Sequence, residues 1–384
     1  LTGSDCDGVA VTGNYAFLPR VGRAPGRRGS FLYRSGSTDV MAWVLEAATA
    51  MIFEKEDEIR AIVEIADKLK SLGINTNMEN IGDPVAKGEV IPEWMKKIVA
   101  DLAMTDCSYG YCATKGVPET RAFLAEMTNS RGKTQVSIDD IIFFNGLGDA
   151  IQKVYGLLKR ESRVIGPTPT YSTHSSAEAA HAGQTPVCYK LDPDNNWYPD
   201  MDDLRLSIKY NPAISGILII NPDNPTGAVW PERILREMVA LAKEFDLFII
   251  ADEIYQNLVY NGESTKPISD LVGDIPAISM KGISKEVPWP GSRCGWIEVY
   301  NVDKDPMFKR YIQSIVDSKM VEVCSTTLPQ KAIPQILSHP EYQDWLDERI
   351  NRYEKFSNIA YDILKQVPGV KVNRTNGAFY MSVA

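Results

Sequence analysis

The sequence predicts an α/β protein with a mainly parallel β-sheet flanked by helices and a smaller α+β domain. Between residues 141 and 299, short apolar segments alternate with helices that are apolar on one side. This pattern is typical of parallel strands buried on both faces. After Asp303 long helices dominate. The chain has 384 residues, more than the roughly 250–300 at which a single hydrophobic core stops growing.

The individual elements follow from apolar spacing and from the positions of proline and glycine. Seven strands are expected at 141–144, 163–165, 186–189, 214–220, 247–251, 277–280 and 295–299. Helices are expected at 54–72, 92–102, 148–159, 172–182, 231–245, 305–319, 329–337 and 341–366, followed by short strands at 370–372 and 378–382.

These elements suggest four segments along the chain. We expect a large domain at 106–302 and a C-terminal small domain at 303–384, which we expect to be incomplete. Residues 51–105 supply a linker and part of the small domain. Residues 1–50 contain an Arg-rich stretch broken by proline and glycine, which indicates an arm or extension. A surface extension is favoured, and an arm packed on a partner subunit is the alternative.

Composition excludes several classes of protein. The net charge of −9 argues against a nucleic-acid surface, which needs a basic face. The six cysteines form no CxxC pair, which favours free thiols in a reducing cytosol. The three histidines lack metal-ligand spacing. No apolar run reaches the roughly 18 residues of a membrane span, and no signal peptide is recognisable. We therefore expect a cytoplasmic enzyme without a metal.

Polar residues follow several of the expected strands, where ligands bind in open α/β sheets. Asn224 lies in a tight turn after the strand at 214–220, although an ordinary Asn-Pro turn would look similar. Asp252 ends the next buried strand, and Tyr255 follows it. A buried acid is costly without a cationic or hydrogen-bonding partner, and a pyridinium nitrogen is one such partner. A helix N-cap is the alternative role for Asp252.

A second group of polar residues is suited to an aldehyde and a phosphate. Lys285 follows a strand, and a lysine amine can form an imine with an aldehyde. Arg293 and Ser284 suit a phosphate dianion. At Leu147 and Gly148 a helix begins after a strand, where backbone amides can approach a phosphate. Each pattern by itself is also common in solvated loops.

Three motifs, NPDNPTG at 221–227, ADEIY at 251–255 and SK-x7-R-x-GW at 284–296, occur together in one order and spacing. In this combination the chain resembles the class I and II aminotransferases of the fold-type-I enzymes that use pyridoxal 5′-phosphate (PLP), and most closely their alanine-aminotransferase-like members. The resemblance runs from about residue 80 to the C-terminal end. It implies a PLP-binding large domain with a mainly parallel seven-stranded sheet and a smaller α+β domain.

The resemblance also implies roles for the residues around the cofactor ring. Lys285 matches the Schiff-base lysine, which moves a proton between the substrate α-carbon and the cofactor. Asp252 matches the acid that keeps the pyridine nitrogen protonated. Tyr255 and Asn224 match the partners of the ring oxygen, and Tyr171 matches the aromatic residue that stacks on the ring.

The phosphate is expected to bind to Arg293, Ser284 and the amides of Leu147 and Gly148. Gly282 stands where many members have a phosphate-binding serine. This departure increases the expected contribution of the arginine and the backbone amides.

Further implied residues concern the substrate and the assembly. Gly82 and Asn224 match residues near the substrate, and Tyr111 matches a tyrosine that reaches the phosphate of the neighbouring subunit, which would require a homodimer. The family usually continues beyond the segment corresponding to Gly377–Tyr380 and supplies an arginine for the substrate carboxylate. This sequence ends at Ala384, so we expect either an incomplete chain or a different carboxylate contact.

These observations predict a ping-pong aminotransferase that moves an amino group between an L-amino acid and a 2-oxo acid. Alanine or aspartate with 2-oxoglutarate is the favoured substrate pair. A PLP-dependent lyase that carries out β-elimination is the alternative, because the same electron sink serves both reactions. A PLP-free binding protein is a third possibility. His174 and Trp289 could border the substrate, but structural roles are favoured for both.

Overall fold

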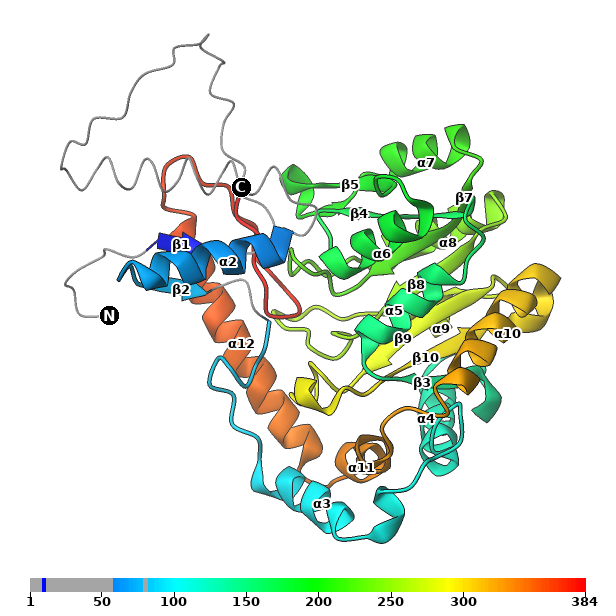
Figure 1. Cartoon of the computed structure of the whole chain (residues 1–384). Coiled ribbons are helices and arrows are strands. Elements are labelled where there is room, and N and C mark those ends of the chain that lie inside the picture. The colour runs from blue at the N-terminus through cyan, green and yellow to red at the C-terminus, as the bar shows by residue number, and fades with distance from the viewer. Residues whose placement is uncertain (1–8, 12–57, 79–81) are drawn as a thin grey trace. The chain divides into compact units, whose positions relative to one another are not determined.

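The computed structural model of the chain describes residues 9–11, 58–78 and 82–384 (Figure 1). The chain divides into two compact units, Leu1–Ile81 with Ala384, and Gly82–Val383. Most of the expected arm at residues 1–50 lies outside the described residues. The proposed division into four segments stays a prediction.

The described part of the first unit is a small α/β arrangement. It contains β1 (Val9–Val11), α2 (Glu58–Ser71) and β2 (Thr76–Met78). The two strands pair in parallel. Ala66 and Leu69 are buried on α2, three residues apart as one helix face requires. The helix expected at 54–72 is thus confirmed where the structure describes it.

The second unit is built on an eight-stranded sheet within the described residues. All seven expected strands are present, and the additional β6 is a two-residue edge strand, too short to show an apolar pattern. Strands β4, β5, β7, β8 and β9 are parallel, whereas β6 and β10 run antiparallel to their neighbours. The sheet order is β3 (Ile141–Phe144), β10 (Gly295–Tyr300), β9 (Ala277–Gly282), β8 (Phe248–Asp252), β7 (Ile214–Ile220), β4 (Arg163–Thr168), β5 (Cys188–Asp192) and β6 (Tyr198–Pro199).

Helices cover both faces of this sheet (Figure 1). The helices expected in this unit are confirmed within a few residues at each end. The sequence did not predict α4, α7 or α9. The helices are α3 (Glu93–Ala103), α4 (Pro118–Arg131), α5 (Leu147–Gly156), α6 (Ser172–Ala182), α7 (Met201–Tyr210), α8 (Glu232–Glu244), α9 (Ile268–Leu271), α10 (Pro306–Val321), α11 (Thr327–Leu337) and α12 (Tyr342–Leu364). Short 3₁₀ helices are η1 (Asp106–Ser108), η2 (Ile138–Asp140), η3 (Pro193–Asn195), η4 (Pro290–Ser292) and η5 (Val302–Lys304).

The two short strands expected near the C-terminal end do not form. Residues there make only isolated bridges, from Val372 to Val383 and from Gly377 to Val259. The apolar alternation in 370–372 and 378–382 indicates which side chains are buried. A strand also requires hydrogen bonds to a neighbouring strand along several residues. That neighbour is missing among the described residues, so the prediction of two strands is wrong.

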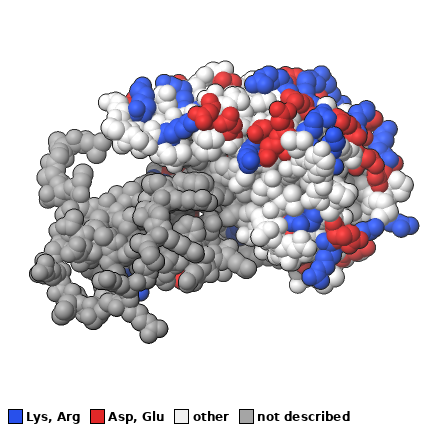
Figure 2. All heavy atoms as spheres, turned by 90° about the horizontal axis from the view of Figure 1, so that it is seen from above, with Lys and Arg blue, Asp and Glu red and all other residues white. Residues whose placement is uncertain are grey.

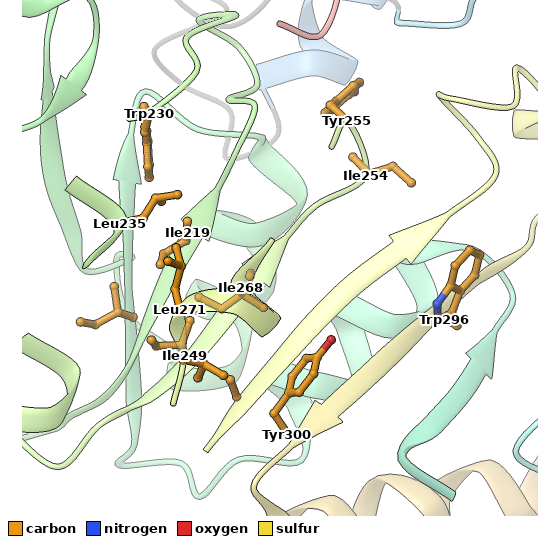
Figure 3. Packing of buried hydrophobic residues seen from close by; sticks show 14 of the residues in the cluster. Ile219, Trp230, Leu235, Ile249, Ile254, Tyr255, Ile268, Leu271, Trp296 and Tyr300 are labelled. Carbon is orange, nitrogen blue, oxygen red and sulfur yellow. The ribbon is translucent and has the colours of Figure 1, made fainter. Parts of the chain in front are cut away.

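The core lies in two layers because successive side chains of a strand point to opposite faces. On β7, Ile217 and Ile219 belong to one buried cluster, together with residues of α4, α8 and α9. Leu218 and Ile220 belong to the other cluster, with residues of α5 and α10. Figure 3 shows the first cluster, in which Ile219, Trp230 and Leu235 lie close together. Continuous apolar strands are therefore the consequence of a sheet buried on both faces.

The described surface carries both signs of charge. On the face drawn in Figure 2, lysine and arginine side chains alternate with aspartate and glutamate side chains, as is usual for a solvated surface. Among the described residues, no helix combines the length and the apolar character needed to cross a bilayer.

Candidate active site

The predicted site residues meet at the carboxyl ends of the parallel strands. Asn224 follows β7, Asp252 is the last residue of β8, and Lys285 follows β9. Strands β7, β8 and β9 are parallel neighbours, so their carboxyl ends lie on one edge of the sheet. The strand pairing thus brings together three motifs that are up to sixty residues or so apart in the sequence.

The amine of Lys285 is mostly buried and has no carboxylate within ion-pair distance among the described residues. Its Nζ donates a hydrogen bond to the carbonyl oxygen of Gly82 at 2.7 Å, and it lies 5.7 Å from the centre of the Phe379 ring. Burial lowers the pKa of Lys285 below its ordinary value; the charges of Asp83 and Asp252 oppose this effect, and that of Arg293 adds to it. A larger fraction of the amine is therefore neutral near pH 7 than for an exposed lysine.

Asp252 is held in place by a histidine that the sequence analysis treated as structural. The Asp252 Oδ2 atom lies 3.1 Å from Nε2 of His174, on α6, and Oδ1 accepts a hydrogen bond from the Ile254 amide at 3.1 Å. Both Asp252 and His174 are buried. The other ring nitrogen of His174 lies 3.3 Å from the hydroxyl of Tyr155. The contacts fix the orientation of the carboxylate, and the helical spacing from Tyr171 to His174 was the signal that could have revealed it.

Tyr255 meets Tyr380, which was not among the predicted site residues. Their hydroxyl oxygens lie 2.9 Å apart. Burial, followed by the neighbouring Tyr380, raises the pKa of Tyr255 well above its ordinary value. A Cβ atom at Gly82 would fall only 2.0 Å from the Tyr380 oxygen, so a larger residue at position 82 would displace this tyrosine. The motif that contains Tyr380 was quoted in the sequence analysis, but its contact partner 125 residues away could not be read from it.

Asn224 and Tyr171 flank this group. Asn224 is buried, and its side chain makes no hydrogen bond to another described residue. Tyr171 is half-buried and packs edge-on against His174, with ring centres 6.2 Å apart. Tyr171 thus lies beside the histidine that contacts Asp252, and the Asn224 amide is available as a donor.

Arg293 lies against the start of α5. The helix begins at Leu147 after Gly146, whose φ of 85° favours glycine. A Cβ atom at Gly146 would fall 2.6 Å from an Nη atom of Arg293, so the missing side chain lets the guanidinium approach the helix end. The first amides of a helix, including those of Leu147 and Gly148, have no partner within the helix. Ser284 is half-buried and donates to no described residue. Arginine and free amides form an anion-binding arrangement.

Tyr111 is not brought to the other candidates within this chain. Its side chain is 86% exposed. It lies in the loop between η1 and α4, near the exposed Tyr109. Its proposed role at the phosphate of a neighbouring subunit stays a prediction.

Glu253, Lys281 and Glu298 form a second group of charged side chains, which interact with one another. We call them the closed group. Lys281 Nζ donates to Glu298 Oε2 at 2.9 Å and lies 3.9 Å from Glu253 Oε2. Glu298 also accepts a hydrogen bond from the Tyr300 hydroxyl at 2.6 Å, and Glu253 accepts one from the Ser279 hydroxyl at 2.5 Å. Burial opposes the charged form of Lys281, but Glu298 and Glu253 outweigh it and raise its pKa.

A cavity of about 90 Å³ borders this closed group. Glu253, Lys281 and Glu286 are among the residues that line it, and none of the predicted site residues does. Each charged side chain of the group has a partner within the group, so we interpret the group as structural.

The fold and the strand-end residues together define a class of enzyme. The family model for aminotransferase class I and II matches residues 76–383. The chain therefore belongs to the class I and II aminotransferases, a family of PLP-dependent transaminases.

Individual relatives agree with this assignment. An uncharacterized aminotransferase of Methanocaldococcus jannaschii is 63% identical over 326 residues, covering 85% of this chain and 76% of that protein. A glutamate-pyruvate aminotransferase of Escherichia coli is 31% identical over 323 residues, covering 83% and 78% respectively. The structure of an alanine aminotransferase from Pyrococcus furiosus superposes with a TM-score of 0.75 at 28% identity, covering 91% of this chain and 83% of that one. The fold is accordingly that of the fold-type-I aminotransferases.

Proposed function

We propose that this aminotransferase binds PLP at Lys285 and exchanges amino groups between an L-amino acid and 2-oxoglutarate. Alanine is the favoured donor and aspartate is the second choice. The observation that carries the proposal is a half-buried amine without an ion-pair partner among the described residues, together with a buried carboxylate and an anion-binding helix end on the same side of the sheet. The glutamate-pyruvate and alanine aminotransferases among the relatives support the choice of alanine.

The groups around the site fit the chemistry of PLP. Its phosphate is a dianion, and the contact between Arg293 and Gly146 leaves a positive charge beside the first amides of α5. Its pyridine nitrogen needs an acid, and Asp252 is buried and oriented by His174. Its ring oxygen needs donors, and Asn224 and Tyr255 supply an amide and a phenol.

When bound, PLP supplies an electron sink that stabilises negative charge developing at the substrate α-carbon. The protein's part is to hold the protons and the orientation. Asp252, fixed by His174 and the Ile254 amide, keeps a proton on the ring nitrogen favourable. Tyr255 and Asn224 would supply hydrogen-bond donors for the ring oxygen, and Tyr171 would supply an aromatic surface for the ring.

Lys285 is proposed to move the proton. Burial lowers the pKa of Lys285, which makes the neutral amine that a general base requires easier to form than at an exposed lysine. The same Nζ donates to the carbonyl of Gly82, a position proposed to lie beside the substrate carboxylate. The base and the substrate-binding backbone are thereby held within one hydrogen bond of each other.

We further propose that two chains complete each other's sites through Tyr111. An aromatic side chain that is 86% exposed is unusual without a partner, and Met104 and Tyr109 in the same segment are also exposed. A two-fold dimer would bury this surface on both chains at once. Analytical ultracentrifugation of wild type and Tyr111→Phe tests the assembly separately from the phosphate contact, because the ring remains while the hydroxyl is lost.

The test of the proposed function combines labelling with an assay. Protein incubated with PLP and then reduced with borohydride should carry the cofactor on the peptide that contains Lys285. Amino donors offered with 2-oxoglutarate should yield glutamate, fastest with alanine. Attachment at another lysine, such as Lys281, or no attachment, would refute the assignment. Release of ammonia and a 2-oxo acid without any acceptor would instead support the lyase.

A further inference from the structure

Two cysteines far apart in the sequence come together beside the loop of Tyr111. Cys112 follows Tyr111 directly, and Cys324 lies in the connection between α10 and α11. The Cys112 thiol donates to the carbonyl oxygen of Ser325 at 3.6 Å, and the Thr327 hydroxyl donates to the carbonyl oxygen of Gly110 at 2.8 Å. The two segments are thus joined by two hydrogen bonds close to the cysteines.

The two thiols are free and half-buried, and the Cys112 thiol contacts the carbonyl oxygen of Ser325, the residue that follows Cys324. Burial raises the pKa of Cys112, and the adjacent Cys324 thiol raises it further. Gln330 of α11 also contacts the Cys112 sulfur, at 3.7 Å. The neighbouring Cys107 is different, because it is exposed and the hydrogen bond from Lys331 lowers its pKa. Cys107 is therefore the more reactive single thiol, whereas Cys112 and Cys324 have each other as partner.

We propose that Cys112 and Cys324 are a redox modification site and form a reversible disulfide by exchange with a small-molecule disulfide. One thiolate of the pair attacks the small disulfide and releases one small thiol. The second cysteine then displaces the other small thiol and closes the bond between the two sulfurs. The pair loses two protons and two electrons, and the small disulfide is reduced to two thiols.

The disulfide would connect two parts of the proposed phosphate site. The Ser325 hydroxyl donates to the carbonyl oxygen of Phe143 at 3.0 Å, and the Thr326 amide donates to the Asn145 side chain at 3.3 Å. Phe143 and Asn145 lead directly into α5. A bond from Cys112 to Cys324 would therefore join the loop of Tyr111 to the segment that supports the start of α5.

The consequence for the cofactor rests on the proposed function. The reduced chain already holds the two segments in contact, so the bond keeps an existing arrangement and restricts its motion. The dissociation rate of PLP from the oxidised protein is then expected to fall by a factor of about two to ten. This factor corresponds to the entropic cost of immobilising one side chain. The midpoint of thermal unfolding should rise by several degrees, because the bond restricts the unfolded chain.

The bond itself is tested on the full chain without any cofactor readout. The protein is equilibrated in buffers of increasing glutathione disulfide to glutathione ratio, blocked with N-ethylmaleimide, digested and analysed by mass spectrometry. A cross-linked peptide pair containing Cys112 and Cys324, lost on reduction with dithiothreitol, is expected. Glutathione adducts without any cross-linked peptide at equilibrium, or unmodified thiols in the most oxidising buffer, overturn the proposal.

Matched variants separate the pair from its neighbour. Cys107→Ser should leave the cross-link unchanged, whereas Cys112→Ser and Cys324→Ser should each abolish it. Both serine variants should also lose the redox dependence of the unfolding midpoint, and a dependence that persists in either variant overturns the proposal. If PLP does not bind to the wild type, the proposed function fails while the cross-link can still form, so the two failures are distinguishable.

Discussion

Asp252 and Lys285 differ from Glu253 and Lys281 in how their charges are balanced, although both pairs come from the ends of β8 and β9. Lys281 is ion-paired with Glu298, and its pKa is raised. In the part of the chain that the structure describes, the Lys285 amine donates only to a carbonyl oxygen, and its pKa is lowered. Alternation at the end of β8 explains why the two acids separate, since Asp252 contacts His174 of α6 whereas Glu253 accepts from the Ile268 amide of α9.

The comparison teaches that burial alone does not distinguish a working lysine from a structural one. Both amines are taken out of water. In the closed group each charged side chain interacts with another charged side chain of the protein, and these ion pairs hold the local packing. By contrast, the amine of Lys285, the amide of Asn224 and the carboxylate of Asp252 form an open group. A ligand can use the hydrogen-bonding capacity that these three side chains retain. Each of the following changes should affect one group and spare the other.

The largest effect is expected for Lys285→Ala. Loss of the proposed proton-transfer group should reduce the rate of amino transfer from alanine to 2-oxoglutarate by ~10²–10⁴-fold. The unfolding midpoint should stay close to that of wild type, because the amine forms no ion pair with a described residue. A coupled assay for pyruvate measures the first effect and calorimetry the second. Activity near the wild-type rate would remove Lys285 from the mechanism.

Lys281→Met should have the opposite signature. The substitution keeps a similar shape but leaves the buried Glu298 and Glu253 without their cation, which should cost about 3–5 kcal/mol of the free energy of unfolding. Urea denaturation measures this loss, with Lys285→Ala as the matched control. The folded fraction should keep its activity. Wild-type stability of Lys281→Met would show that the closed group does not hold this part of the fold.

A change of pH should weaken the closed group gradually. Burial opposes ionisation of Glu298, but Lys281 and the surrounding donors lower its pKa below the ordinary 4.5. Its stabilisation is therefore complete above pH 4.5 and is lost as the pH falls through the folded-state pKa. The pKa of Lys281 is raised above the ordinary 10.5. Lys281 therefore stabilises the folded state fully below pH 10.5, and this contribution is lost as the pH rises through its folded-state pKa.

The difference in stability between wild type and Lys281→Met should therefore be widest between these limits and narrow at both ends. Denaturation curves at a series of pH values measure it. Glu253 has a pKa raised by burial, so it acts in the opposite sense in acid, and Glu253→Gln controls for its contribution. A difference independent of pH would argue against the ion pair.

The smallest effect is expected for Tyr255→Phe. Removing one neutral hydrogen-bond donor should cost about 0.5–1.5 kcal/mol, or roughly tenfold at most in kcat/KM. Tyr300→Phe is the matched control, because that hydroxyl donates to Glu298 in the closed group and its loss should lower stability rather than activity. Steady-state kinetics and urea denaturation on both variants test the contrast. The expected contrast is refuted if both variants lose activity alone or both lose stability alone.

Much of the fold could be predicted because its pattern is local. Seven strands and most of the long helices follow from apolar spacing. Helix α4 was missed because polar Thr120 and Arg121 are buried on it, which hides the apolar face. At the C-terminal end alternation suggested strands, but Val372 and Gly377 find only single bridging partners.

The sequence by itself determined the order of the elements, the positions of Asn224, Asp252 and Lys285 after their strands, and the family. These properties depend on neighbours within a few residues, where spacing is informative. The tertiary structure alone decided which lysine is left without an ion pair, that His174 orients Asp252, and that Tyr380 meets Tyr255. Those outcomes depend on which strands become neighbours and which face each side chain takes, because charge and hydrogen-bond balance are set by residues distant in the sequence.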